Sequence, residues 1–247
     1  MSGLSGLRTA LAFLTRLPVP APAWSADGLA RAAVWFPLVG LLVGAVAAGV
    51  RALAGLGLEP APATVLALAA AVLVTGALHE DGLADTADGL GAHVSRERRL
   101  EIMRDSRIGT YGALGVVLPL GLAYATLSPL GVEDFARAVV CAHVLGRWST
   151  LPQAFFIAGA REGGAGASLT VSLPALILGT VATVAVAIGF GGLVPGLVAL
   201  GVAVALGVLC GAALHRVLGG VTGDTFGAVN KLTEVATYAS LVAVWGA

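Results

Sequence analysis

Long apolar stretches alternate with short polar ones along the 247 residues of the chain. A helix that crosses the hydrocarbon core of a membrane needs about 20 predominantly apolar residues. The first expected span contains Gly40 and Gly44, a pair of small residues four apart that favours close packing with another helix. A last stretch, about residues 235–245, is only just long enough to cross if it is helical. Six other stretches suit a spanning helix better: about residues 33–53, 64–78, 111–130, 135–158, 173–191 and 195–214.

The N-terminal segment has a different pattern. Its arginines, Arg8 and Arg16, lie off an apolar stripe, and Pro18 and Pro20 follow the stripe. Spacings of three and four place apolar side chains on one helical face, and such a helix lies in the plane of the membrane surface. We therefore expect a short interfacial helix whose apolar face is formed by Leu4, Leu7, Leu11 and Leu14.

Composition agrees with a membrane location. Hydrophobic residues make up 57% of the chain and charged residues 11%, whereas a soluble domain carries roughly 25% charged residues. The mean hydropathy is +0.93. The sequence predicts an all-α polytopic membrane helical bundle with about seven transmembrane helices, forming a single integral membrane domain over residues 1–247. A formal net charge of zero gives no indication of a nucleic-acid-binding surface.

The distribution of lysine and arginine predicts the orientation. When the loops are numbered alternately across the membrane, one side receives eleven of these residues and the other receives Arg137 and Arg51. Positively charged loops stay in the cytoplasm. We therefore expect a protein of a bacterial-type plasma membrane with a cytoplasmic N-terminus. Two polar segments, residues 79–112 and 215–234, are expected at the same cytoplasmic face.

The first polar segment is dense in carboxylates. Asp81, Asp85 and Asp88 stand at positions i, i+4 and i+7, which share one face of a helix. Three carboxylates at that spacing repel one another, and oxygen ligands favour a hard cation such as Mg²⁺ or Mn²⁺. The alternative is a solvated acidic turn, but glycine and alanine between the charges leave the carboxylates accessible to a bulky substrate. His79, at the end of a span, is a candidate ligand or an interfacial side chain.

Four residues just before the third expected span suit phosphate: Arg104, Asp105, Ser106 and Arg107. Guanidinium groups bind phosphate oxygens in a bidentate fashion. The alternative is a positively charged anchor at the start of a helix. Together with the carboxylates and a divalent metal, the arginines indicate phosphoryl or nucleotidyl transfer.

The second polar segment is weaker evidence on its own. Asp224 lies in a glycine-rich turn and can complete a metal site with the aspartates, while Asn230 and Lys231 are candidates for contact with a phosphate. In the fourth expected span, Arg147 follows His143 by four residues. An arginine within a membrane is a functional candidate, although it can also neutralise an acid inside the bundle.

These motifs resemble the cobalamin synthase family, the adenosylcobinamide-GDP ribazoletransferases, and the resemblance runs from end to end of the chain. The first motif is long and specific: His79-x-Asp81-Gly82-Leu83-Ala84-Asp85-Thr86-Ala87-Asp88-Gly89. The others are Arg104-Asp105-Ser106-Arg107-Ile108-Gly109-Thr110-Tyr111-Gly112, Gly219-Gly220-Val221-Thr222-Gly223-Asp224-x-x-Gly227-Ala228 and Phe13-Leu14-Thr15-Arg16-Leu17-Pro18-Val19-Pro20.

The resemblance implies a reaction. A ribose hydroxyl of α-ribazole, or of its 5′-phosphate, attacks the cobinamide-side phosphorus of adenosylcobinamide-GDP, and GMP leaves. The implied cofactor is Mg²⁺, and homo-oligomerisation or association with other cobalamin-assembly enzymes is compatible with the resemblance. The roles that we expect are metal binding by Asp81, Asp85 and Asp224, metal binding or proton transfer by Asp88, and pyrophosphate binding by Arg104, Arg107 and Lys231.

Three alternatives compete with this interpretation at the level of the sequence. A CDP-alcohol phosphatidyltransferase also places aspartates on helices at the cytoplasmic face, but its arginine is missing after Ala84. UbiA-like prenyltransferases need a second aspartate-rich motif, and the second polar segment contains a single aspartate. From another class, a membrane transporter with an acidic ion site predicts discontinuous helices and charges near the middle of the membrane.

Overall fold

The computed structural model describes residues 3–20, 23, 25–161 and 169–246. Residues 162–168 of the glycine-rich loop after the fourth expected span lie outside them. Within the described residues the structure is helical, apart from one isolated β-bridge between Gly159 and Val221. The elements are α1 (Gly3–Leu14), α2 (Ala26–Ala32), η1 (Ala33–Trp35), α3 (Phe36–Ala54), α4 (Pro60–Thr75), α5 (Leu78–Gly91), α6 (Arg96–Ile102), α7 (Thr110–Leu127), α8 (Val132–Phe156), α9 (Leu173–Gly191), α10 (Leu193–Leu218) and α11 (Gly223–Trp245).

The all-α membrane architecture is confirmed. Four helical segments are long and apolar enough to cross a membrane, Ala26–Ala54, α7, α9 and α10, and the pair α4 and α5 makes a fifth if it is one broken span. The expected spans at 135–158 and 235–245 correspond to α8 and the second half of α11. Neither helix is among these segments. Both carry charged side chains, and both lie at the centre of the bundle.

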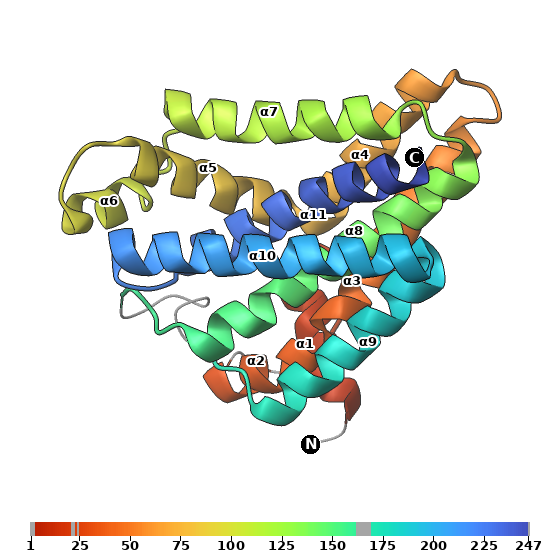
Figure 1. Cartoon of the computed structure of the whole chain (residues 1–247). Coiled ribbons are helices and arrows are strands. Elements are labelled where there is room, and N and C mark those ends of the chain that lie inside the picture. Colours follow the sequence, from red (N-terminus) through yellow and green to blue (C-terminus); the bar gives the residue numbers. More distant parts are fainter. Residues whose placement is uncertain (1–2, 21–22, 24, 162–168, 247) are drawn as a thin grey trace.

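The centre of the bundle is formed by α8 and α11, which pack against each other, with α3 beside α8 and α5 beside α11. Every residue from 138 to 151 of α8 is buried. In contrast, α7, α9 and α10 expose many large apolar side chains. Figure 1 shows α7, α10 and α11 running across the molecule, with α5 and α6 at one end. The exposed apolar helices are the surface that lipid covers.

The glycine pair of α3 packs as the sequence predicts. A Cβ atom on Gly40 would lie 2.3 Å from the backbone oxygen of His143, and one on Gly44 would lie 2.8 Å from Cα of Val140. Neither position has room for a side chain. Because glycine has none, the backbones of α3 and α8 can touch.

The second expected span is broken rather than straight. Helix α4 ends at Thr75, and α5 leaves it at an angle of 86°. At the break, Gly76 and Ala77 both adopt left-handed backbone conformations, with φ of 64° and 58°. The backbone N–H of Arg16 donates to the oxygen of Val74 at 2.7 Å, so the segment after α1 covers this corner. The break turns α5 inward, between α7 and α11, with Asp85 and Asp88 half-buried and Asp81 exposed.

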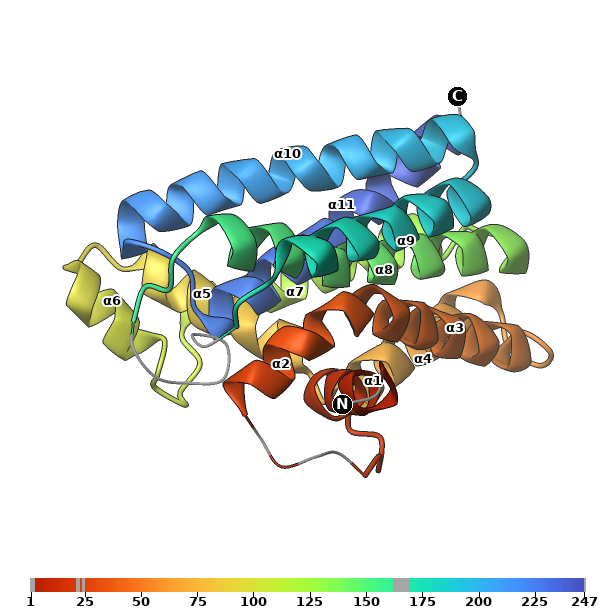
Figure 2. The same ribbon diagram turned by 90° about the horizontal axis from the view of Figure 1, so that it is seen from below.

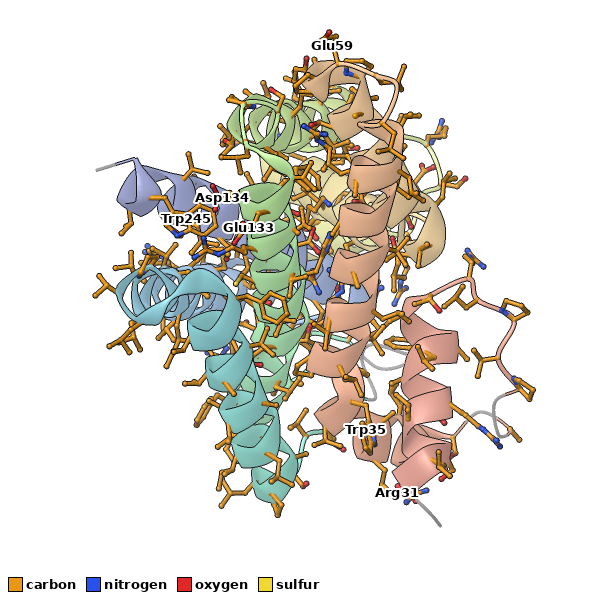
Figure 3. All side chains as sticks on the ribbon, turned by 90° about the vertical axis from the view of Figure 1, so that its right-hand side faces the viewer. Arg31, Trp35, Glu59, Glu133, Asp134 and Trp245 are labelled. Atoms are coloured by element: carbon orange, nitrogen blue, oxygen red, sulfur yellow. The ribbon has the colours of Figure 1, made fainter. Side chains whose placement is uncertain are left out.

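The N-terminal helix expected from the leucine stripe is α1. It ends at Leu14, before Pro18, and packs on α2 and α3; Figure 2 shows α1 and α2 together on one side of the bundle. The end of the molecule remote from α5 and α6 carries Glu59, Glu133, Asp134 and Trp245, which face the viewer in Figure 3. There Arg137 pairs with Asp134 at 2.9 Å and lies over the ring of Trp245.

Candidate active site

The two polar segments meet where α5 touches the start of α11. A Cβ atom on Gly82 would lie only 2.6 Å from the backbone oxygen of Asp224. The glycine therefore allows the two backbones to approach, and Asp81, Asp85 and Asp224 come to lie around one crossing point. Although Asp81 and Asp224 are 143 residues apart in sequence, the two segments share one end of the bundle, as the sequence predicts.

The carboxylates at this crossing act strongly on one another. Asp85 is partly withdrawn from water, and its largest electrostatic interactions with acids are with Asp81, Asp224 and Asp88. Arg161 supplies the opposing positive charge. The helical spacing of the three aspartates on α5 is confirmed, and the repulsion expected from that spacing is present.

A short pairing of two loops brings Arg161 to the acids. The backbone N–H of Ala160 donates to the oxygen of Val221 at 2.8 Å, and that of Val221 donates to Ala158 at 3.0 Å. Arg96 clamps both loops, because its guanidinium donates to the oxygens of Leu218 and Ala160. The side chain of Arg161 then pairs with the Asp224 carboxylate at 3.0 Å.

Asp88 is engaged by backbone amides. Its two carboxylate oxygens accept hydrogen bonds from the N–H groups of Gly109, at 2.7 Å, and Gly112, at 2.8 Å. These are orphan donors at the start of α7, so Asp88 caps that helix from α5. Side chains at Gly109 or Gly112 would collide with the carboxylate. The predicted role of Asp88 in metal binding or proton transfer stays a prediction, and the structure adds this anchoring contact.

The predicted phosphate-binding residues Arg104, Asp105, Ser106 and Arg107 form the exposed loop between α6 and α7. Arg107 donates to Asp105 at 2.7 Å, and its side chain is 87% exposed. This pairing lowers the pKa of Asp105 to about 2, so both groups are charged at neutral pH. The loop borders an open cleft of about 320 Å³ whose wall includes Asp88, Asp105 and Arg107.

Behind the aspartates lies a buried network of charged side chains. Lys231 Nζ contacts Glu80 Oε1 at 2.7 Å and Glu234 Oε2 at 2.9 Å. Glu234 also accepts from Arg147 and lies 2.8 Å from His143 Nδ1. Arg147 and Glu234 are each only 1% exposed. With neutral histidines, the two cations of the network, Lys231 and Arg147, balance its two carboxylates, so it carries no net charge. Its ion pairs connect α5, α8 and α11.

This network contains several residues that the sequence analysis assigned to the substrate. Lys231 and Arg147 are held by carboxylates inside the bundle, and His79 Nδ1 lies 3.4 Å from Arg147. Asn230 is buried against Gly146 of α8. Contact of these four side chains with substrate remains a prediction. In the structure, Lys231 and Arg147 contact Glu80 and His79 of α5 from inside the bundle. Arg147 has the acid partner that the alternative interpretation required.

Sequence reasoning did not single out the partners of these residues. Glu80 and Glu234 lie in the two polar segments, but only the folded structure shows that both pair with Lys231. Arg96 and Arg161 lie in polar segments between apolar stretches, where the sequence alone gives them no partner. A signal was available for Arg161, since it is the cation closest to the end of α8 in an otherwise glycine-rich loop.

The donor set suits a hard divalent cation. Among the described residues, no group of three or more histidine, cysteine, aspartate or glutamate side chains is arranged to hold a metal by itself. Mg²⁺ typically takes one or two carboxylates and completes its shell with water and substrate phosphates. The excess negative charge around Asp85, countered by Arg161 alone among its largest interactions, fits such a cation.

Comparison with known proteins assigns the chain to a family. The model of cobalamin-5-phosphate synthase matches residues 6–242. The chain belongs to the cobalamin-5-phosphate synthase family. It is 45% identical to the adenosylcobinamide-GDP ribazoletransferase of Roseiflexus, over 94% of this chain and 87% of the relative. The protein of that name in Bradyrhizobium diazoefficiens is 41% identical, over 94% and 91%. No solved structure matches the chain.

Membership of the cobalamin-5-phosphate synthase family agrees with the resemblance in the sequence motifs, and the names of the relatives are those of transferases. The match covers α5, the loop before α7 and the start of α11, so all the elements of the candidate site lie within it.

Proposed function

We propose that this protein is an Mg²⁺-dependent adenosylcobinamide-GDP ribazoletransferase. The observation that carries the proposal is the meeting of three family motifs at one end of the bundle, where Gly82 lets α5 touch α11 beside Asp224. The substrates are adenosylcobinamide-GDP and α-ribazole or its 5′-phosphate. The names of relatives that the chain matches nearly end to end support this choice.

In this reaction a ribose hydroxyl attacks the cobinamide-side phosphorus, and GMP leaves. Asp81, Asp85 and Asp224 would hold Mg²⁺, which when bound neutralises charge on the diphosphate. The exposed loop that carries Arg104 and Arg107 lies next to Asp88, at the mouth of the site. We propose that its guanidinium groups orient phosphate oxygens of the substrate.

Asp88 has two duties in this proposal. Its amide contacts hold the arginine loop close to α5, and its remaining lone pairs are available to a metal or to the proton of the attacking hydroxyl. The buried pair of Glu80 and Lys231 lies one residue from Asp81 and fixes the start of α5. A fixed helix keeps the carboxylates in place when charge develops on the substrate.

We further propose that the aspartate end of the bundle faces the cytoplasm, as the lysine and arginine distribution predicts. This orientation places the site where water-soluble substrates arrive. Single cysteines introduced at exposed Ser106 and at Glu59, at the remote end of the bundle, test it: an impermeant thiol reagent should label Ser106→Cys in inverted membrane vesicles and Glu59→Cys in intact cells.

The activity is tested with purified protein in lipid nanodiscs, supplied with adenosylcobinamide-GDP, α-ribazole and Mg²⁺. Release of GMP with formation of the joined product is expected, and Asp85→Asn should remove it. Release of CMP from a CDP-lipid, without release of GMP, would instead support the phosphatidyltransferase alternative.

One structural observation favours a second candidate, the transporter. The broken pair of α4 and α5 and the buried charges behind it are features of helix-interrupted ion sites. Metal-dependent flux across vesicles, without any release of GMP, would support transport. The match to transferases over the whole bundle makes group transfer the stronger proposal.

A further inference from the structure

Arg161 differs from the other cations near the site in how its donors are used. Arg96 donates to two backbone oxygens, Lys231 is enclosed between two glutamates, and Arg107 pairs with Asp105 at the surface. Arg161 uses Nη2 for Asp224, at 3.0 Å, while its Nη1 is buried without a hydrogen-bond partner. One arm of its guanidinium fork is therefore available for another acceptor.

The position of Arg161 suits an anion that arrives with a metal. Its side chain is 17% exposed, and it is the positive charge among the strongest interactions of Asp85. Asp224 pairs with it, and Asp85 and Asp81 interact with Asp224, so the net charge of this group is negative. A divalent cation held among these carboxylates would neutralise that charge and would reduce the need of Asp224 for a guanidinium partner.

The backbone just before Arg161 is held in place, whereas the side chain makes a single ion pair within the described residues, with Asp224. The residues just before it pair with Val221, and Arg96 fixes the oxygen of Ala160. A change of partner from Asp224 to a nearby acceptor would therefore involve the side chain of Arg161 and leave the backbone in place. A guanidinium fork recognises two oxygens of a phosphate better than an ammonium group does.

We propose that Arg161 binds the diphosphate of the nucleotide substrate, and that it leaves Asp224 to do so. The inference rests on the proposed function and adds to it a residue for which the sequence analysis expected no role. Arg161 acts here as a binding residue at Asp224, whereas the loop of Arg104 and Arg107 lies at Asp88.

The test compares Arg161→Gln and Arg161→Lys with a matched control, Arg8→Gln, which removes one exposed positive charge from α1. GDP with Mg²⁺ serves as the binding probe in titration calorimetry, and KM and kcat are measured for GMP release. Arg161→Gln should weaken GDP binding by about 10- to 100-fold and raise KM accordingly, because a charge-assisted hydrogen bond is lost. Arg161→Lys should recover part of the affinity, and the control should bind as the wild type does.

Unfolding without nucleotide separates binding from a structural role. The proposal expects the midpoint of Arg161→Lys to stay close to that of the wild type while its GDP affinity falls. Unchanged GDP affinity and KM in both variants would overturn the role of Arg161 and leave the proposed function standing. A wild-type protein that neither binds GDP nor releases GMP would overturn both.

Discussion

Replacing Gly82 by alanine tests whether the crossing of α5 and α11 positions the site. The added methyl carbon would lie 2.6 Å from the backbone oxygen of Asp224. The helices must separate by about 0.8 Å before that contact becomes ordinary. Because the obstacle is backbone, no side-chain rotation relieves it. Overpacking of this kind costs about 1–3 kcal/mol of stability.

The expected effect on catalysis is similar in free energy to the effect on stability, because each tenfold in rate corresponds to about 1.4 kcal/mol. A shift approaching 1 Å between catalytic groups lowers turnover by about 10²-fold. We expect Gly82→Ala to release GMP from adenosylcobinamide-GDP at about one hundredth of the wild-type rate while remaining folded in nanodiscs.

Gly121→Ala is the matched control, because a Cβ atom on this glycine of α7 meets nothing within 4 Å. It should keep wild-type turnover and thermal unfolding. Wild-type turnover in Gly82→Ala would refute the argument that the approach of α5 to α11 sets the geometry of the site. Equal losses in both variants would show that glycine at a helix interior, and not the crossing, is what matters.

Three further changes test other parts of the structure. Asp88→Asn should abolish turnover in a protein that stays inserted and stable, with faster hydrogen exchange at the amides of Gly109 and Gly112; near-wild-type activity would remove Asp88 from the mechanism. Lys231→Met leaves Glu80 without its cation inside the bundle, and it should lower the free energy of unfolding by about 3–5 kcal/mol, measured by denaturation in detergent; an unchanged midpoint would contradict the network. Chelation of divalent cations should stop GMP release, Mg²⁺ or Mn²⁺ should restore it, and added Mg²⁺ should raise the unfolding midpoint of the wild type more than that of Asp85→Asn; turnover that persists in the chelator would exclude a metal requirement.

The sequence reveals features that depend on local spacing. The three aspartates lie on one helix because i, i+4 and i+7 share a face, and the pair Gly40 and Gly44 packs tightly for the same periodic reason. Alternation of apolar stretches places the aspartates and Asp224 at the same end. Each of these follows from the period of a helix or the thickness of a membrane.

Other features depend on contacts that no local pattern encodes. The break before α5 uses Ala77 in a left-handed conformation, which is uncommon for a residue other than glycine and has no signal in the sequence. Lys231 and Glu80 are 151 residues apart, so only the packing of α11 on α5 shows that the lysine is enclosed. Hydropathy identifies the lipid-facing helices as membrane spans. It does not reveal that α8 and α11, which carry the buried charges, form the centre of the bundle.

The buried pair of Arg147 and Glu234 constrains how the protein is made. Arg147 enters the membrane on α8, and its carboxylate partner follows 87 residues later on α11. A charge within the bilayer costs at least ~2.5 kcal/mol while it is uncompensated. The bundle therefore cannot close as its helices emerge one after another. Its assembly waits for the last helix, because until α11 is in place the guanidinium of Arg147 lacks its carboxylate partner.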